Sequence, residues 1–266
     1  GYVAGSAVTT GGNNTSLGSR ALNLTTTGSA NTALGREALY SNTTADNNTA
    51  VGYQAGYSNT TGAELTAIGY FSGKSNTTGV ANTAVGFQPL HSTTTGSANN
   101  AFGSGALYHN TTGTNNVAMG VNSVVTNTTG ANNVGIGRDA LYSNTTASNN
   151  TAVGYQAGYS ITTGDRNIGI GSTALYHTTT GQGSIAIGFQ ALKTASTGDD
   201  NVAIGSDSPT SNAALESLTT GVKNVSVGNN SGVGITTSGF NTFLGFGAGE
   251  QGNKSESVLI GYNAGR

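Results

Sequence analysis

Short apolar and polar segments return along this chain at a fixed interval. The segment NTAVG at 48–52 is followed 17 residues later by LTAIG at 65–69. The residue before the closing glycine is apolar, the residue two places earlier is Thr, Val or Ile with Asn100 as the exception, and the residue between them is nearly always Ala, Gly or Ser. A side-chain period of two is typical of a β-strand. Each repeat therefore predicts a short strand such as 49–51, with its apolar columns on one side and its small column on the other. We expect the apolar columns to form a continuous interior spine and the small column to face outward.

The closing glycine, here called the anchor, holds this register along the chain. Positions are counted from it, so that Val51 is at position −1 of the anchor Gly52. The anchors are Gly1, Gly18, Gly35, Gly52, Gly69, Gly86, Gly103, Gly120, Gly137, Gly154, Gly171, Gly188 and Gly205 at steps of 17, then Gly228, Gly245 and Gly261 at steps of 23, 17 and 16. A fixed period of this length indicates a repeat architecture. We expect a regular solenoid over 1–205, an inserted loop at 206–211, and less regular coils over 212–266.

The rest of each repeat completes the predicted coil. An aromatic residue often stands at position +1, a small residue at +3 and Leu or Gly at +4, so we expect a second short strand, for example over 53–57. Thr-Thr-Gly follows, as at 60–62, where we expect the glycine to supply a positive φ in a tight turn. Asn recurs at position −4, as in Asn31, Asn82, Asn116 and Asn133. We interpret this column as a ladder of amides that bond to neighbouring coils.

These patterns predict an all-β fold, a parallel β-solenoid of about sixteen 17-residue coils. No segment has the 3.6-residue apolar period of a helix. Ordering one coil costs about 1 kcal/mol or more per residue, while three medium apolar side chains return about 1.5–3 kcal/mol each. Burial of apolar side chains inside a single chain therefore does not offset the entropy cost of ordering each coil. Because columns of Ala, Gly and Ser allow another backbone to approach closely, we expect a parallel homotrimer, although a thin single coil also favours small residues.

A resemblance supports this interpretation. The strings NTAVGYQAGYSNTTG (from 48 and, in nearly the same form, from 150) and NNVGIGRDALYSNTT (from 132) resemble the repeats of phage tail-fibre and bacterial surface-fibre proteins. The NTAVG core is also similar to the repeats in the heads of trimeric autotransporter adhesins. The resemblance covers essentially the whole chain. It implies a left-handed, trimeric β-roll, located on a virion or outside the cell and involved in attachment. A heptad stalk, a membrane anchor and a C-terminal chaperone-like domain are not recognisable in the sequence.

Composition and charge narrow the function classes. Charged residues make up 8 % of the 266 residues, with a formal net charge of −2, so the basic surface of a nucleic-acid binder is not expected. The chain has no Cys, which removes thiolate chemistry and disulfides. No apolar run approaches the roughly 20 residues of a membrane helix. We expect no enzyme activity, no catalytic, cofactor-binding or metal-binding residues, and no cofactor.

Several residues are nevertheless candidates for chemistry. His91, His109 and His177 are interpreted as surface histidines, because no carboxylate recurs beside them. The adjacent pairs Arg36-Glu37, Arg138-Asp139 and Asp165-Arg166 are interpreted as solvated charge, and Asp199-Asp200 as a turn. The glycines of 245–249 match a phosphate loop only weakly. Glycosylation motifs at Asn42, Asn59, Asn76, Asn110 and Asn144 are interpreted as by-products of the repeat.

Two features are weighed as binding surfaces. A tyrosine column at position +5 either stacks on glycans or packs as a ladder between coils, and we favour the ladder. The residues of this column are Tyr40, Tyr57, Tyr108, Tyr142, Tyr159 and Tyr176. The insertion 206–211 either contacts a receptor or is a tolerated solenoid loop.

The leading functional hypothesis is a structural fibre or adhesin shaft, which mediates attachment to a cell surface or host receptor through a surface glycan or protein. Two alternatives remain: a subunit of an extracellular filament, and an ice-binding β-solenoid. The second rests on the threonine columns that include Thr26, Thr43, Thr60, Thr77 and Thr94. Adjacent threonines at a turn point to alternating sides rather than forming a flat two-row face, so ice binding ranks lower. We expect no membrane insertion and no nucleic-acid partner.

Overall fold

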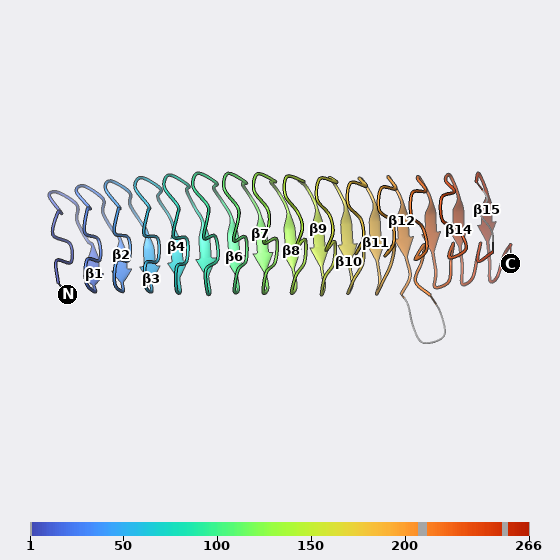
Figure 1. Cartoon of the computed structure of the whole chain (residues 1–266), viewed down its shortest axis with the longest axis horizontal. Helices are drawn as coiled ribbons and strands as arrows, with labels where there is room; N and C mark the ends of the chain where they lie inside the picture. Colours follow the sequence, from blue (N-terminus) through green and yellow to red (C-terminus); the bar gives the residue numbers. More distant parts are fainter. Residues whose placement is uncertain (1, 207–211, 252–254, 266) are drawn as a thin grey trace. The chain divides into compact units, whose positions relative to one another are not determined.

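The computed structural model describes residues 2–206, 212–251 and 255–265. Its described residues form three-residue strands, one per repeat, and no helix (Figure 1). The strands are β1 (Thr15–Leu17), β2 (Thr32–Leu34), β3 (Thr49–Val51), β4 (Thr66–Ile68), β5 (Thr83–Val85), β6 (Asn100–Phe102), β7 (Val117–Met119), β8 (Val134–Ile136), β9 (Thr151–Val153), β10 (Ile168–Ile170), β11 (Ile185–Ile187), β12 (Val202–Ile204), β13 (Val225–Val227), β14 (Thr242–Leu244) and β15 (Val258–Ile260). The predicted parallel β-solenoid is confirmed, with about fourteen turns of about 17 residues between the first and last strands.

The chain divides into two compact units, Gly1–Asn132 with β1 to β7 and Asn133–Arg266 with β8 to β15. Within each unit, consecutive strands pair in parallel, one repeat apart. In the first unit Val51 pairs with Ile68, and in the second Ile168 pairs with Ile185. Val202 pairs with Val225 across the 23-residue step, so the insertion leaves the strand register intact. The predicted loop at 206–211 falls, apart from Ser206, outside the described residues.

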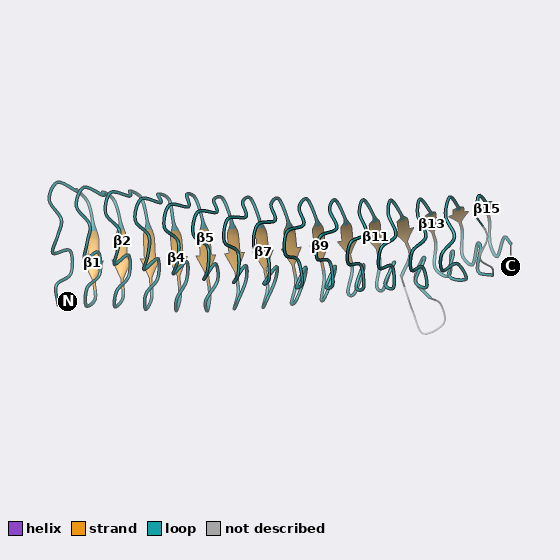
Figure 2. Ribbon diagram, turned by 45° about the horizontal axis from the view of Figure 1, so that its top comes forward, coloured by secondary structure: helices purple, strands orange, loops and turns teal. Residues whose placement is uncertain are grey.

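The expected second strand after the anchor is absent from the described repeats, where this segment is a turn (Figure 2). Its φ angles explain the difference. Gln54 and Gly56 have φ of 51° and 60°, and Gln156 and Gly158 have φ of 53° and 60°. A β-strand needs a strongly negative φ at every residue. The turns of neighbouring coils still bond to each other, since the Gly56 N–H donates to the Ser72 carbonyl at 2.9 Å.

The strands point the opposite way from the prediction. Their small middle residues face the interior, where Ala50 and Ala67 are fully buried. The flanking aliphatic residues face outward, with Leu34 43 % and Ile68 39 % exposed. The reason is the width of the coil: a Cβ added to Gly169 would lie 3.3 Å from Cδ1 of Leu175 in the opposite wall. The small column therefore makes room for this chain's own leucines and not for the backbone of a second chain.

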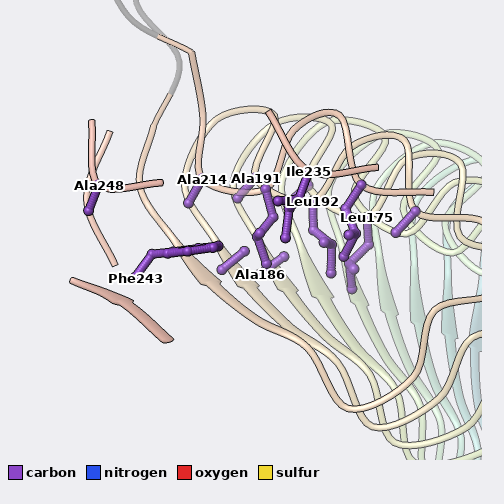
Figure 3. Packing of buried hydrophobic residues seen from close by; sticks show 13 residues of the cluster. Leu175, Ala186, Ala191, Leu192, Ala214, Ile235, Phe243 and Ala248 are labelled. Atoms are coloured by element: carbon purple, nitrogen blue, oxygen red, sulfur yellow. The ribbon is translucent and has the colours of Figure 1, made fainter. Parts of the chain in front are cut away.

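The filled volume of the interior is kept nearly constant, because a small residue at one interior position is compensated by a larger residue at another. Position +4 is Leu in many repeats and Gly in others, and a larger side chain elsewhere fills each gap. A Cβ on Gly56 would lie 3.1 Å from Leu65, and one on Gly158 would lie 3.1 Å from Ile161. A Cβ on Gly249 would lie 2.5 Å from the ring of Phe243, which replaces the usual Ala in β14 (Figure 3). Cores tolerate such exchanges when the total volume is conserved.

The asparagine ladder at position −4 is confirmed, and the structure adds its geometry. Asn150 Oδ1 accepts the N–H of Asn167 at 2.8 Å, while Asn150 Nδ2 donates to the Gly164 carbonyl at 2.9 Å. Asn150 thus bonds to the backbone of the following coil at two points, as do Asn31, Asn82 and Asn167. Asn48, Asn99 and Asn224 are likewise fully buried. Buried amides are favourable only when they are bonded in this way.

The glycine of Thr-Thr-Gly has a different role from the one predicted. Gly62 is not among the residues with positive φ, whereas the anchor Gly52 has φ of 136°. A Cβ on Gly62 would lie 2.4 Å from the Gly79 carbonyl oxygen of the next coil. This glycine therefore permits close stacking of backbones, although Ala45 and Ala147 occupy the same position in two repeats.

Candidate interaction surfaces

The first candidate surface is the outward side of the strands, here called the aliphatic face. It carries the residues at positions −3 and −1 of each repeat. The exposed members at position −1 are Leu17, Leu34, Ile68, Phe102, Met119, Ile136, Ile170, Ile187, Ile204, Leu244 and Ile260, at 37–65 %. Position −3 is Thr or Asn in β1 to β6, β9 and β14, so the apolar row within each unit is formed mainly by position −1. Exposed apolar surface of this kind marks interaction sites in soluble proteins. The alternation in the sequence reveals this column but not its outward direction.

The second surface is the ring column at position +1. Its rings stack where aromatic residues occupy consecutive coils: the centroids of Tyr53 and Tyr70 are 5.5 Å apart, and those of Tyr70 and Phe87 are 5.2 Å apart. Phe246 and Tyr262 stack at 5.7 Å in the same way. Interplanar angles of 6° to 18° show that rings in this column lie nearly parallel. Successive coils therefore hold successive rings about one strand spacing apart.

The tyrosine column at position +5 packs as the favoured ladder. Tyr40 stacks on Tyr57 at 5.1 Å, and Tyr159 stacks on Tyr142 at 5.0 Å and on Tyr176 at 5.2 Å. These rings cover each other's faces, so the column offers mainly ring edges to a ligand. Burial raises the pKa of Tyr159, with the neighbouring Tyr142 and Tyr176 adding to the effect.

The three histidines each pack against a tyrosine ring and do not gather into one cluster. His91 stacks on Tyr108 at 4.8 Å, while His109 and His177 pack edge-on against Tyr108 and Tyr176, each at 4.7 Å. Burial lowers the pKa of His91, and the charges of Lys74 and His109 lower it further. Within the described residues no three His, Asp or Glu side chains come together as a metal site would require.

Two of the charged pairs are less solvated than the sequence suggested. Glu37 is 5 % exposed and Asp139 7 % exposed. Glu37 forms an ion pair with Arg20 of the preceding coil and accepts a hydrogen bond from Gln54 of the next coil at 2.6 Å. The Gln54 bond and then the charges of Arg20 and Arg36 lower the pKa of Glu37. The adjacent pair Arg36-Glu37 in the sequence does not indicate these contacts, because the partners Arg20 and Gln54 lie one repeat away.

The remaining acidic pairs stabilise the coil backbone. Asp165 Oδ1 accepts the N–H of Ser148 at 2.6 Å, and Asp199 Oδ1 accepts the N–H of Gln182 at 2.8 Å. Asp200 has φ of 55°, which agrees with a turn. Of the glycines that resemble a phosphate loop, Gly247 and Gly249 lie in the turn after β14, with Gly249 against Phe243.

The threonine columns lie on two sides of the turn. At position +8 the hydroxyls are used within the fold: Thr60 Oγ1 donates to the Thr77 carbonyl at 2.9 Å, and Thr77 Oγ1 to Thr94. At position +9 the threonines, such as Thr61 and Thr163, are exposed. Only one regular row of threonines per turn is therefore presented to solvent.

The asparagines of the glycosylation motifs are buried. Asn42, Asn59, Asn76, Asn110 and Asn144 are 0–1 % exposed and form a second amide column at position +7. Asn76 Nδ2 donates to Asn59 Oδ1 at 2.7 Å. A glycan on these amides is incompatible with the folded coil. The sequence repeat showed this column, but its polar character concealed its burial.

No helix among the described residues has the length and apolar character to cross a membrane. Comparison with family models, curated proteins and solved structures finds no match to this chain. By its own structure, the chain is a parallel β-solenoid repeat protein with an exposed aliphatic face and a stacked ring column.

Proposed function

We propose that this protein is a structural attachment shaft of the tail-fibre or surface-fibre kind, built from three parallel copies and located outside the cell or on a virion. The observation that carries the proposal is the aliphatic face. Most strands send a small residue, usually a buried Ala, inward and leave a larger apolar residue at position −1 exposed or half-buried, so the chain leaves much of its apolar surface unburied.

A second and third copy would bury this surface. Position −1 adds one apolar side chain per strand, and parallel association of identical chains would align the columns of each copy within each unit. Removing apolar area from water returns about 25 cal/mol per Å². This gain adds to an interior made largely of Ala, Leu and bonded Asn. The resemblance to trimeric autotransporter heads favours three copies over two.

Light scattering coupled to gel filtration tests the assembly. We expect a mass three times the 26.3 kDa of one chain. Ile170→Lys combined with Ile187→Lys places charges on the aliphatic face at residues that are 39 % and 37 % exposed in the single chain, so the chain should fold and lose its trimeric mass. The matched control, Thr163→Lys with Thr180→Lys, adds the same charges to the exposed threonine row of neighbouring coils and should remain trimeric. A monomeric wild-type protein contradicts the proposal.

Ice binding remains a second candidate because the exposed threonines of position +9 recur once per coil. The hydroxyls of position +8 donate to backbone carbonyls and so add no second free row. Thermal hysteresis measured on the purified chain decides this alternative, and a wild-type solution without hysteresis removes it. A filament built end to end would instead show a mass that keeps rising with concentration.

A further inference from the structure

The ring column at position +1 contains one place where two rings flank a small residue. Ser172 follows Tyr155 by one coil and precedes Phe189 by one coil. In the part of the chain that the structure describes, this ring–small–ring order occurs here alone. We call this place the Ser172 gap. It lies within the second unit, where β10 pairs with β9 on one side and with β11 on the other.

The backbone fixes the three residues in order. The Thr173 N–H donates to the Tyr155 carbonyl at 2.9 Å, and the Gln190 N–H donates to the Ser172 carbonyl at 3.0 Å. The coil of Ser172 therefore lies directly between the coils of the two rings. Tyr155 is 47 % and Phe189 41 % exposed, so solvent reaches both side chains.

The first unit shows what a filled position looks like. There Tyr70 occupies the middle coil, and Tyr53, Tyr70 and Phe87 stack with separations of 5.5 and 5.2 Å. Removing the middle ring from such a stack leaves two nearly parallel rings about two strand spacings, or about 10 Å, apart. Ser172 takes the place of the middle ring between Tyr155 and Phe189, so we infer the same spacing for this pair.

The width of the gap selects the shape of a ligand. A flat aromatic ring between two others needs carbon contacts of about 3.5–4.0 Å on each side, or about 7–8 Å in total. A saturated six-membered ring is thicker by roughly 1 Å per side because of its pucker and its hydrogens, and so spans about 9–10 Å. The saturated ring fills the gap more completely.

The polar groups around the gap are neutral. Gln156 and Gln190 stand at position +2 beside the two rings, with Thr173 between them. The Thr173 hydroxyl is covered, so the half-buried side chains of Gln156 and Gln190 are the polar groups within reach of a ligand. Positions +1 and +2 of these three coils carry no formal charge. Apolar walls with a few uncharged donors and acceptors fit a ligand whose faces are C–H and whose rim is hydroxyl.

We propose that the Ser172 gap binds one neutral pyranose ring of a surface polysaccharide, held between the faces of Tyr155 and Phe189. Its hydroxyls bond to the amides of Gln156 and Gln190. This inference deepens the proposed attachment function and rests on it for its biological role. The ring column lies beyond the anchor glycine, on the turn side of each coil, so association through the strands leaves a route to the gap.

The first experiment exposes the wild-type protein to an array of neutral hexose, N-acetylhexosamine and deoxyhexose oligosaccharides and measures affinity for the best of them by calorimetry. We expect saturable binding with one site per chain. Binding to none of these sugars overturns the proposal. Binding of oligothymidylate in preference to every sugar also overturns it, since a flat base would then be the ligand.

Two variants localise the site without relying on disruption of the fold. Ser172→Tyr restores the continuous ring stack seen in the first unit and should weaken binding at least tenfold while leaving the unfolding temperature unchanged. In the Ser172→Tyr background, Tyr70→Ser with Phe71→Thr should recover binding, because it recreates the gap between Tyr53 and Phe87. There Gln54 and Gln88 stand where Gln156 and Gln190 stand in the natural site.

Undiminished binding by the Ser172→Tyr variant contradicts the location. Light scattering on the same samples separates this inference from the function proposed above. A trimer that binds no sugar refutes the Ser172 gap alone, whereas a sugar-binding monomer refutes the trimeric shaft alone.

Discussion

The asparagine ladder gives a sharp quantitative prediction at Asn150. Replacing Asn150 by Ala removes the acceptor of the Asn167 N–H and the donor to the Gly164 carbonyl. Asn150 and Asn167 are fully buried and Gly164 is also buried, so the groups that lose these bonds lie away from bulk solvent. Each orphaned buried group costs about 1–3 kcal/mol, so Asn150→Ala should lower the free energy of unfolding by about 2–6 kcal/mol.

In many coils a second asparagine, at position +7, also donates to the carbonyl of the residue at position +10. The Gly164 carbonyl has no such second donor, because position +7 of its coil is Ile161. In the first unit the corresponding Gly113 carbonyl accepts from both Asn99, at 2.8 Å, and Asn110, at 3.1 Å. Asn99→Ala should therefore cost about 1–3 kcal/mol less than Asn150→Ala, since that carbonyl keeps a partner. The comparison changes the same residue type in the same column.

Urea unfolding followed by far-ultraviolet circular dichroism measures both values at equal protein concentration. Thr146→Ala, on the exposed threonine row, is the control and should change stability by less than about 0.5 kcal/mol. Two results would refute the reasoning: an Asn150→Ala variant as stable as the control, or an Asn99→Ala variant less stable than Asn150→Ala. Either would mean that the amide ladder is not what holds successive coils together.

Three further predictions follow from the interior and from the buried carboxylate. Gly154→Ala should lower the free energy of unfolding by more than about 3 kcal/mol, because φ of Gly154 is 139° and the new Cβ would lie 2.6 Å from the Gly171 carbonyl oxygen. Thermal or urea unfolding measures this value, and a loss below about 1 kcal/mol contradicts the prediction. Gly158→Leu and Ile161→Asn should each destabilise the protein alone. The double variant recreates the Leu141/Asn144 pattern and should show a favourable coupling free energy of about 1–3 kcal/mol in a double-mutant cycle. Additive effects of the two substitutions would contradict the exchange of volume between these positions. The folded-state pKa of Glu37 is lowered, so its stabilising contribution is present above the ordinary Glu value of 4.5 and is lost as pH falls through the folded-state value. Glu37→Gln should therefore lose part of the acid sensitivity of the melting temperature, and an unchanged pH profile would show that the ion pair with Arg20 contributes nothing measurable.

The period of the sequence determined the class of fold. An interval of 17 residues between anchors can be maintained over a whole chain only if each repeat makes the same contacts with its neighbours, and the paired strands follow it residue by residue. The column at position −4 also identified the amide ladder, because a buried polar column without charge must bond along the stack. The tyrosine ladder followed from the same logic, since equal residues one repeat apart lie one strand spacing apart.

Only the tertiary structure decided which side of the strand is inside. A period of two separates Ala50 from Val51, but it gives no sign of direction, and the general preference for burying large aliphatic residues pointed the wrong way. The width of the coil reversed it: where the wall opposite the strand carries a leucine such as Leu175, the strand has room only for a small residue such as Gly169. The same narrowness buries Asn59 and Asn76, which look like surface glycosylation motifs in the sequence. Contacts between residues 17 positions apart, such as those of Glu37 with Arg20 and Gln54, depend on how the coils stack, and local sequence spacing does not encode them.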